Sequence, residues 1–209
     1  MTPRDIHTEY RSRVRVKPEQ DHSGWLRARM VHFSEWEDRA TIAIFLVQEL
    51  QRTNQFTAAE VLLREDIAKH PRHPYPLIAL AEHYHYCVRD LTKAKLFIAR
   101  ALGRARLVRE FVYHSLGVQA RLAVETQDWK LFERSLRQLT AYRHKTGNAD
   151  VFPERDFLAN IPQGTVSPEV VRAYVRRRSY LSAIGYSTLT GRSTGRHTGG
   201  PSARPGAAG

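Results

Sequence analysis

Apolar residues recur at helical spacing along much of the chain between residues 35 and 146. In the segment that begins at Phe56, further apolar residues follow at Ala59, Leu63 and Ile67, with acidic and basic residues between them. Spacings of three and four residues place these side chains on one face of an α-helix, which must then pack against a neighbour. The pattern predicts an all-α fold.

Helix-breaking residues divide the pattern into six predicted helices. Ser34 and Glu37 form an S-x-x-E capping box, which predicts a helix start, and the proline-rich segment 70–76 ends the second helix. The first helix is apolar on most sides, as expected if neighbours cover both of its flanks. The six helices are expected at about residues 35–52, 56–69, 75–88, 91–104, 108–126 and 128–146.

Both ends of the chain differ from this helical region. We expect residues 1–33 to form a flexible basic arm with a short helix at 24–33, although alternation in 11–16 also allows a short strand. Residues 147–185 read as a loop followed by a capping helix, because Ser167 and Pro168 are favoured at a helix N-cap and first helical position. The Gly/Ser/Thr-rich tail 186–209 has few large apolar residues and is expected to be disordered.

The six helices form three pairs with a repeated pattern. In the second helix of each pair, a large residue, a central residue and another large residue follow at spacings of three and four. These triplets are Phe56, Ala59 and Leu63; Leu91, Ala94 and Ile98; and Trp129, Phe132 and Leu136. The first helices are marked by Leu46 and Leu50, Leu80 and Tyr84, and Leu116 and Ala120.

This arrangement resembles the tetratricopeptide repeat (TPR), a helix–turn–helix unit of about 34 residues with a small central residue and a closing proline. The resemblance covers about residues 35–146 of a predicted repeat region 34–146, and it departs from the family pattern in several places. No pair carries the consensus glycine of the first helix, pair two has an extra residue in its turn, and Phe132 replaces the small residue in pair three. The resemblance implies a TPR-like α-solenoid of three pairs closed by the C-terminal capping helix.

A TPR-like solenoid implies a non-enzymatic scaffold whose groove holds a peptide or helix of a partner protein. In one form of this expectation, the bound segment of the partner is acidic. The first helix of each pair lines that groove in the family. The candidate groove residues are therefore Gln48 and Arg52 in pair one, His83 and Tyr86 in pair two, and Tyr113 and Gln119 in pair three.

Charge adds an alternative. The chain has a formal net charge of +12, and residues 89–109 carry seven Lys or Arg against one Asp. Lys93, Arg100 and Arg104 share one predicted helix face. This basic face is either a solvated outer surface or a site for an anionic partner, so the alternative function is sequence-nonspecific nucleic-acid binding driven by the basic surface.

Other kinds of chemistry have little support. His83, His85 and Cys87 lie close in sequence, but His85 would point about 200° away from the other two on a regular helix, so no metal or other cofactor is expected. No catalytic motif is present. Cys87 is the only cysteine, and the longest apolar run, residues 42–47, is too short to cross a bilayer. The expectation is a cytoplasmic protein without a membrane segment.

Overall fold

The computed structural model describes residues 2–141, 158 and 161–176, and every regular element in this part of the chain is a helix. The last described helix comprises residues 168–176. The earlier helices are α1 (Pro3–Val16), α2 (Ser23–Met30), α3 (Trp36–Arg52), α4 (Phe56–Lys69), α5 (Tyr75–His83), the π-helical turn η1 (Tyr84–Val88), α6 (Leu91–Val108), α7 (Val112–Glu125) and α8 (Trp129–Ala141).

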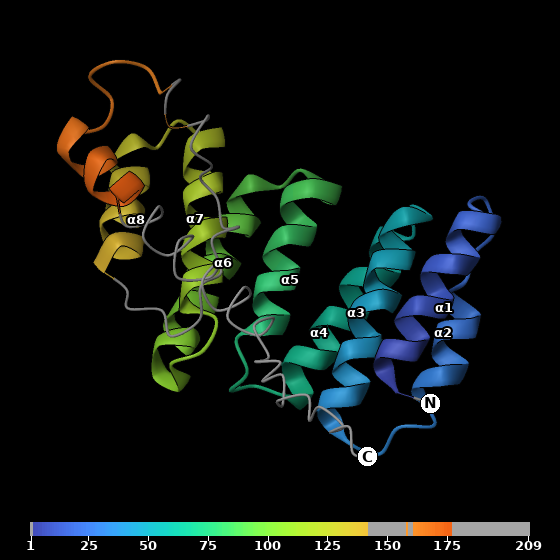
Figure 1. The fold of residues 1–209 in the computed structure, drawn as a ribbon. Helices are drawn as coiled ribbons and strands as arrows, with labels where there is room; N and C mark the ends of the chain where they lie inside the picture. The colour runs from blue at the N-terminus through green and yellow to red at the C-terminus, as the bar shows by residue number, and fades with distance from the viewer. Residues whose placement is uncertain (1, 142–157, 159–160, 177–209) are drawn as a thin grey trace, which may run out of the picture.

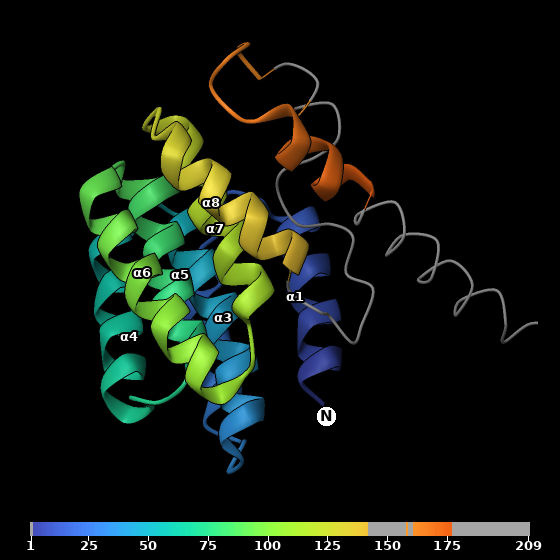
Figure 2. The same ribbon diagram turned by 90° about the vertical axis from the view of Figure 1, so that its left-hand side faces the viewer.

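The helices are stacked in chain order. From α2 onward each helix packs against the next one, and in addition α1 packs on α3 and α5 packs on α7. Figure 1 shows the resulting row, with α1 and α2 at one end and α8 with helix 168–176 at the other. In the turned view of Figure 2, α4 and α6 lie on one side of the row, and α3 and α7 lie on the other.

The paired organisation predicted from the sequence is present in the helix boundaries. The second helices of the three pairs begin at Phe56, Leu91 and Trp129, the first residue of each predicted triplet. All of the central and following large residues are buried, with exposures of 5% or less: Ala59, Leu63, Ala94, Ile98, Phe132 and Leu136. The repeat alignment therefore selected residues that are buried in these helices.

The turns inside the pairs also repeat. Asn54, Arg89 and Gln127 each lie two residues before the second helix, and each has a positive φ, between 53° and 62°. The left-handed conformation ends the first helix and redirects the chain. A shared turn conformation at equivalent positions is independent support for three equivalent pairs.

The extra residue of pair two is accommodated in η1. The N–H of Gln55 donates to the carbonyl of Leu50 five residues earlier, at 2.7 Å, and Asp128 donates to Ala123 in the same way, at 2.8 Å. In pair two the Asp90 N–H instead reaches back six residues, to Tyr84, at 2.9 Å. A π-helical turn is the usual way in which a helix absorbs one inserted residue.

The N-terminal region is a helix and not the expected flexible arm. Thr2 and Asp5 cap α1 reciprocally, since the Thr2 side chain accepts from the Asp5 N–H at 3.2 Å and the Asp5 carboxylate accepts from the Thr2 N–H at 2.7 Å. Pro3 occupies a first-turn position, where its missing N–H costs nothing. Ile6 and Tyr10, one turn apart, are buried against the core.

A buried carboxylate fastens this N-terminal region to α3. Glu49 accepts hydrogen bonds from the Tyr10 hydroxyl at 2.8 Å and from the His22 N–H at 2.7 Å, and its side chain is fully buried. Arg52 pairs with Glu49 at 2.7 Å and also donates to the backbone carbonyls of Pro18 and Gln20. Burial raises the pKa of the Tyr10 hydroxyl, which therefore remains a proton donor to Glu49.

Two predicted helix boundaries differ from the structure. Helix α3 begins with Glu35 at the N-cap, so Ser34 lies one position too early for the expected capping box. Helix α6 continues past Gly103 to Val108, because Leu102 and Ala105 extend its buried face, and it ends where Arg109 adopts a left-handed conformation.

The far end of the stack is closed by helix 168–176. Val170 and Tyr174 are buried in a cluster that also contains residues of α7 and α8, and the Ser167 N–H donates to Glu133 of α8 at 3.2 Å. A helix over the last pair agrees with the predicted capping helix. Its expected continuation to about residue 184 and the expected disordered tail lie outside the described residues.

Candidate functional site

A groove lies between α3 and α5, in the middle of the stack. These two helices barely approach each other directly, whereas α1 packs on α3 and α5 packs on α7. The space between them is about 230 Å³, and residues of α4 form its floor. Its apolar lining includes Ala40, Ala43, Ile44 and Val47 of α3, Leu62 of α4 and Ala79 of α5.

Small side chains keep this groove open. Ala43 of α3 and Ala79 of α5 line it and are only half-buried, although both belong to apolar helix faces. Side chains of this size cannot reach across to the opposite helix. Apolar walls thus remain accessible in the middle of the stack, and exposed apolar concavities of this kind are typical of binding sites.

The charged residues that line the groove are both acidic. Asp66 of α4 and Glu82 of α5 contribute carboxylates, and no Lys or Arg lines this part of the described structure. Asp66 lies 3.7 Å from His70, and Glu82 lies 3.6 Å from His114. Burial raises the pKa of the Asp66 carboxyl, so the groove holds a carboxylate that is incompletely solvated.

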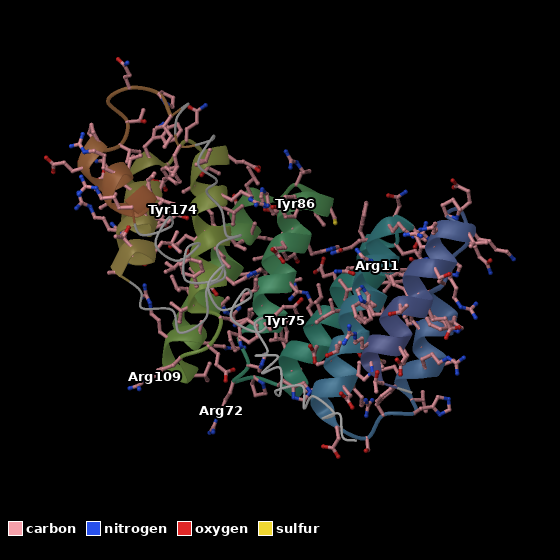
Figure 3. The ribbon with its side chains drawn as sticks, in the orientation of Figure 1. Arg11, Arg72, Tyr75, Tyr86, Arg109 and Tyr174 are labelled. Atoms are coloured by element: carbon pink, nitrogen blue, oxygen red, sulfur yellow. The ribbon has the colours of Figure 1, made fainter. Side chains whose placement is uncertain are left out.

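Two tyrosines mark the ends of the α5 wall. Figure 3 shows Tyr75 at one end of α5 and Tyr86 beyond the other end. Burial and the nearby Glu82 raise the pKa of Tyr75 to about 12. The Tyr86 hydroxyl accepts a hydrogen bond from Arg121 of α7, and Cys87 lines the groove beside it. Tyr86 and Cys87 both lie in the π turn η1, which therefore determines how their side chains face the groove.

The groove continues past Ala40 and Ala43 into a second hollow along α3 and α4. The second hollow shares Leu62 and Asp66 with the first and is lined further on by the cations Arg39 and Lys69, as well as by Met30, Ser34 and His70. The charge along the groove is therefore uneven, with carboxylates toward α5 and cations toward the start of α3.

The groove brings together two of the six residues predicted to line it. Gln48 is exposed in α3, and Tyr86 is 46% exposed at the end of η1. Both line the space between α3 and α5. A partner in this groove would contact both side chains.

The other four predicted groove residues have different roles. His83 is fully buried, with its Nδ1 3.1 Å from the Gln51 amide, and burial lowers its pKa. Tyr113 is 4% exposed within the core around α7 and α8. Arg52 holds the segment after α1 through Pro18 and Gln20, and Gln119 accepts from Ser135 of α8 at 3.2 Å. Each of the four lies in the first helix of its pair, but its side chain is buried or bonded to a neighbouring element.

The histidines of pair two contact opposite neighbours. His83 faces Gln51 of α3, whereas the fully buried His85 lies 2.7 Å from Glu125 of α7. Cys87 is half-buried at the groove, and burial raises the pKa of its thiol. The described residues contain no group of three or more His, Cys, Asp or Glu side chains arranged to hold a metal ion.

The predicted basic face on α6 is only partly free. Lys93 pairs with Asp90 at 3.2 Å and lies 5.1 Å from the centre of the Tyr84 ring. Arg100 is exposed, with its guanidinium 5.7 Å from the Phe97 ring centre, and Arg104 is half-buried. The three cations therefore do not form one uninterrupted stripe.

Sequence reasoning missed most of the groove. We expected neighbours to cover both flanks of the first helix, and the open space beside Ala40, Ala43 and Ile44 contradicts this expectation. The available signal was a run of small residues at helical spacing in α3, facing Ala79 in the next first helix. Small residues at such positions also allow close helix packing, and the sequence alone does not separate the two outcomes.

Neither models of protein families, nor curated proteins, nor solved structures give a match to this chain. Within the described residues, no helix combines the length and apolar character needed to span a membrane.

Proposed function

We propose that this protein is a non-enzymatic interaction scaffold, a TPR-like α-solenoid that binds a helix or peptide of a partner protein in the groove between α3 and α5. The groove carries this proposal. It is apolar, open and formed by two first helices that are separated in the middle of an otherwise continuous stack.

The solenoid interpretation is supported by the three equivalent pairs. Their second helices begin at the predicted residues, and their turns share one left-handed position. In a stack of such units, each pair contacts mainly its neighbours, and binding surfaces run along the first helices. The buried Glu49 cluster adds rigidity to the α3 wall of the groove, which favours binding to a pre-formed site.

The groove can be tested with a library of random peptides displayed on phage. Peptides selected on the full-length protein should lose at least about tenfold in affinity for Ala43→Trp, because an indole at this position would fill the groove. Ala99→Trp is the matched control, since Ala99 is exposed on α6. Selected peptides that bind both variants as well as the parent would contradict the proposal, with circular dichroism as the folding control.

A further inference from the structure

The groove has a charge opposite to that of the protein. The chain has a net charge of +12, yet the charged side chains that line the groove between α3 and α5 are Asp66 and Glu82. A ligand drawn to the protein by its overall charge would be anionic, and it would meet two carboxylates here. The local charge, and not the total, acts on a group inserted into the groove.

These carboxylates lack the arginine ion pairs that several other acids of the chain have. Glu9, Glu60 and Glu133 each pair with an arginine four residues further along the same helix, at 2.6–2.9 Å. Among the described residues, the ion-pair partners of Asp66 and Glu82 are histidines, which carry charge only when protonated, at 3.6–3.7 Å. The negative charges of Asp66 and Glu82 are therefore less neutralised than those of Glu9, Glu60 and Glu133.

The walls beside the two carboxylates are apolar. Ala79 and Pro76 of α5 and Leu62 of α4 line the same space as Asp66 and Glu82. Lys and Arg have long aliphatic stems that pack on apolar surface while their charged ends reach a carboxylate. A Leu or Ile neighbour in the ligand would cover the remaining apolar wall, whereas an inserted Asp or Glu would be desolvated beside like charge.

From this we infer that the groove takes an amphipathic segment of a partner protein in which a Lys or Arg, flanked by apolar side chains, lies against Asp66 and Glu82. This inference rests on the proposed function and names the chemistry of its partner. It replaces the expectation of an acidic peptide for this groove.

Three synthetic helical peptides of about four turns provide the test. Each carries Leu at positions that form one face, and they differ only at one central position on that face, which is Lys, norleucine or Glu. Affinities are measured by fluorescence anisotropy with the full-length protein at about 0.15 M salt, where distant charges are screened. The Lys peptide should bind at least about tenfold more tightly than the Glu peptide, with the norleucine peptide between them.

Protein variants locate the preference. Asp66→Asn with Glu82→Gln should abolish the difference between the Lys and Glu peptides and leave the norleucine affinity within about twofold, which also shows that the variant is folded. Glu110→Gln with Glu169→Gln makes the same change in net charge at two exposed positions and should keep the preference. Loss of the preference in this control would overturn the inference, because the effect would then come from total charge.

The remaining outcomes separate the two proposals. Equal affinity of the parent protein for all three peptides, with each weakened by Ala43→Trp, would overturn the cationic partner and support the groove. Failure of every peptide to bind, or binding that Ala43→Trp leaves unchanged, would count against the groove itself. Sedimentation of the protein alone as a dimer that the Lys peptide dissociates would assign the groove to a second copy of this chain and overturn the inference.

Discussion

The groove between α3 and α5 and the outer surface of α6 belong to the same two helical pairs, but their charged side chains have different kinds of contact. On α6 the exposed cation Lys93 has a nearby acidic partner, and Arg100 lies over an aromatic ring. In the groove, Asp66 and Glu82 lie beside apolar walls without a Lys or Arg partner among the described residues. Lys93 and Arg100 on α6 thus have an acidic or an aromatic contact, whereas the ion-pair partners of the groove carboxylates are histidines.

This difference means that the net charge of the protein does not indicate where a binding site lies. Solvated cations keep a protein soluble and attract polyanions at long range. A half-buried carboxylate in an open apolar groove is costly to the folded protein unless a ligand compensates it. The groove is a region in which the fold leaves favourable interactions unmade, and changes in the groove and on α6 should have unequal effects.

Removing the anchor of the groove wall should have the largest effect on stability. Glu49→Ala leaves Arg52 without its carboxylate and Tyr10 without its acceptor in a buried setting, and it should cost about 3–5 kcal/mol in free energy of unfolding. Glu9→Ala, which breaks only the surface pair with Arg13, should cost at most about 0.5 kcal/mol. Urea denaturation measures both, and equal losses would mean that the buried cluster does not fasten α1 to α3.

The inner and outer sides of α6 should respond differently to the same substitution. Ala94 is fully buried on α6, which packs against α5, so Ala94→Leu should overpack the core there and cost about 1–3 kcal/mol. Ala99→Leu, on the exposed side of α6, should be nearly neutral. Thermal melts of the two variants test this, and a parent-like melt for Ala94→Leu would show that the repeat alignment is misplaced in pair two.

Charge reversal on α6 should have little effect on binding in the groove. Replacing Lys93, Arg100 and Arg104 together with Glu should change the affinity of a groove-selected peptide by no more than about twofold at physiological salt, because screening weakens charges beyond about 8 Å. A larger loss, with helical content unchanged, would move the site to the basic face. If binding then falls steeply with rising salt and is lost after nuclease treatment, nucleic-acid binding is the better account.

The smallest predicted effect concerns the stability cost of Asp66. Its folded-state pKa is raised by burial, so the folded protein holds this proton more tightly than the unfolded chain. The ionised group therefore destabilises the fold at neutral pH, and the penalty disappears as pH falls below the ordinary value of 3.8. Asp66→Asn should raise Tm slightly at pH 7 and by less near pH 4, whereas Glu110→Gln should not. A lower Tm for Asp66→Asn would show that the carboxylate stabilises the fold.

Sequence reasoning predicted the helical pairs well because their signals are local and repeated. The triplet that contains Ala94 selected buried residues, and the turn at Arg89 was expected to contain one extra residue, which the structure accommodates as a π turn. Helix α1 was missed, although Thr2, Pro3 and Asp5 carry a start signal, because its basic composition suggested a flexible arm.

The site was less predictable because it is an open space between two helices that do not pack directly against each other. Gln48 and Tyr86, predicted from their positions on first helices, line the groove, but Tyr113 occupies a comparable position and is buried. Whether an apolar face meets a neighbour or remains open depends on how far successive pairs separate. That separation results from packing over the whole stack and has no local signature in the sequence.

Cys87 offers the most direct measurement of where a partner binds. It is the only cysteine in the chain and lines the groove beside Tyr86. The rate at which N-ethylmaleimide alkylates Cys87 is measured with and without a saturating concentration of a groove-selected peptide. Because alkylation depends on the local exposure of the thiol, the bound peptide should slow it at least about fivefold. The control protein carries Cys87→Ala and Ala99→Cys, which places the thiol on the outer side of α6, and its rate should not change. An unchanged rate at Cys87 with protection of the thiol at position 99 would contradict the groove as the binding site.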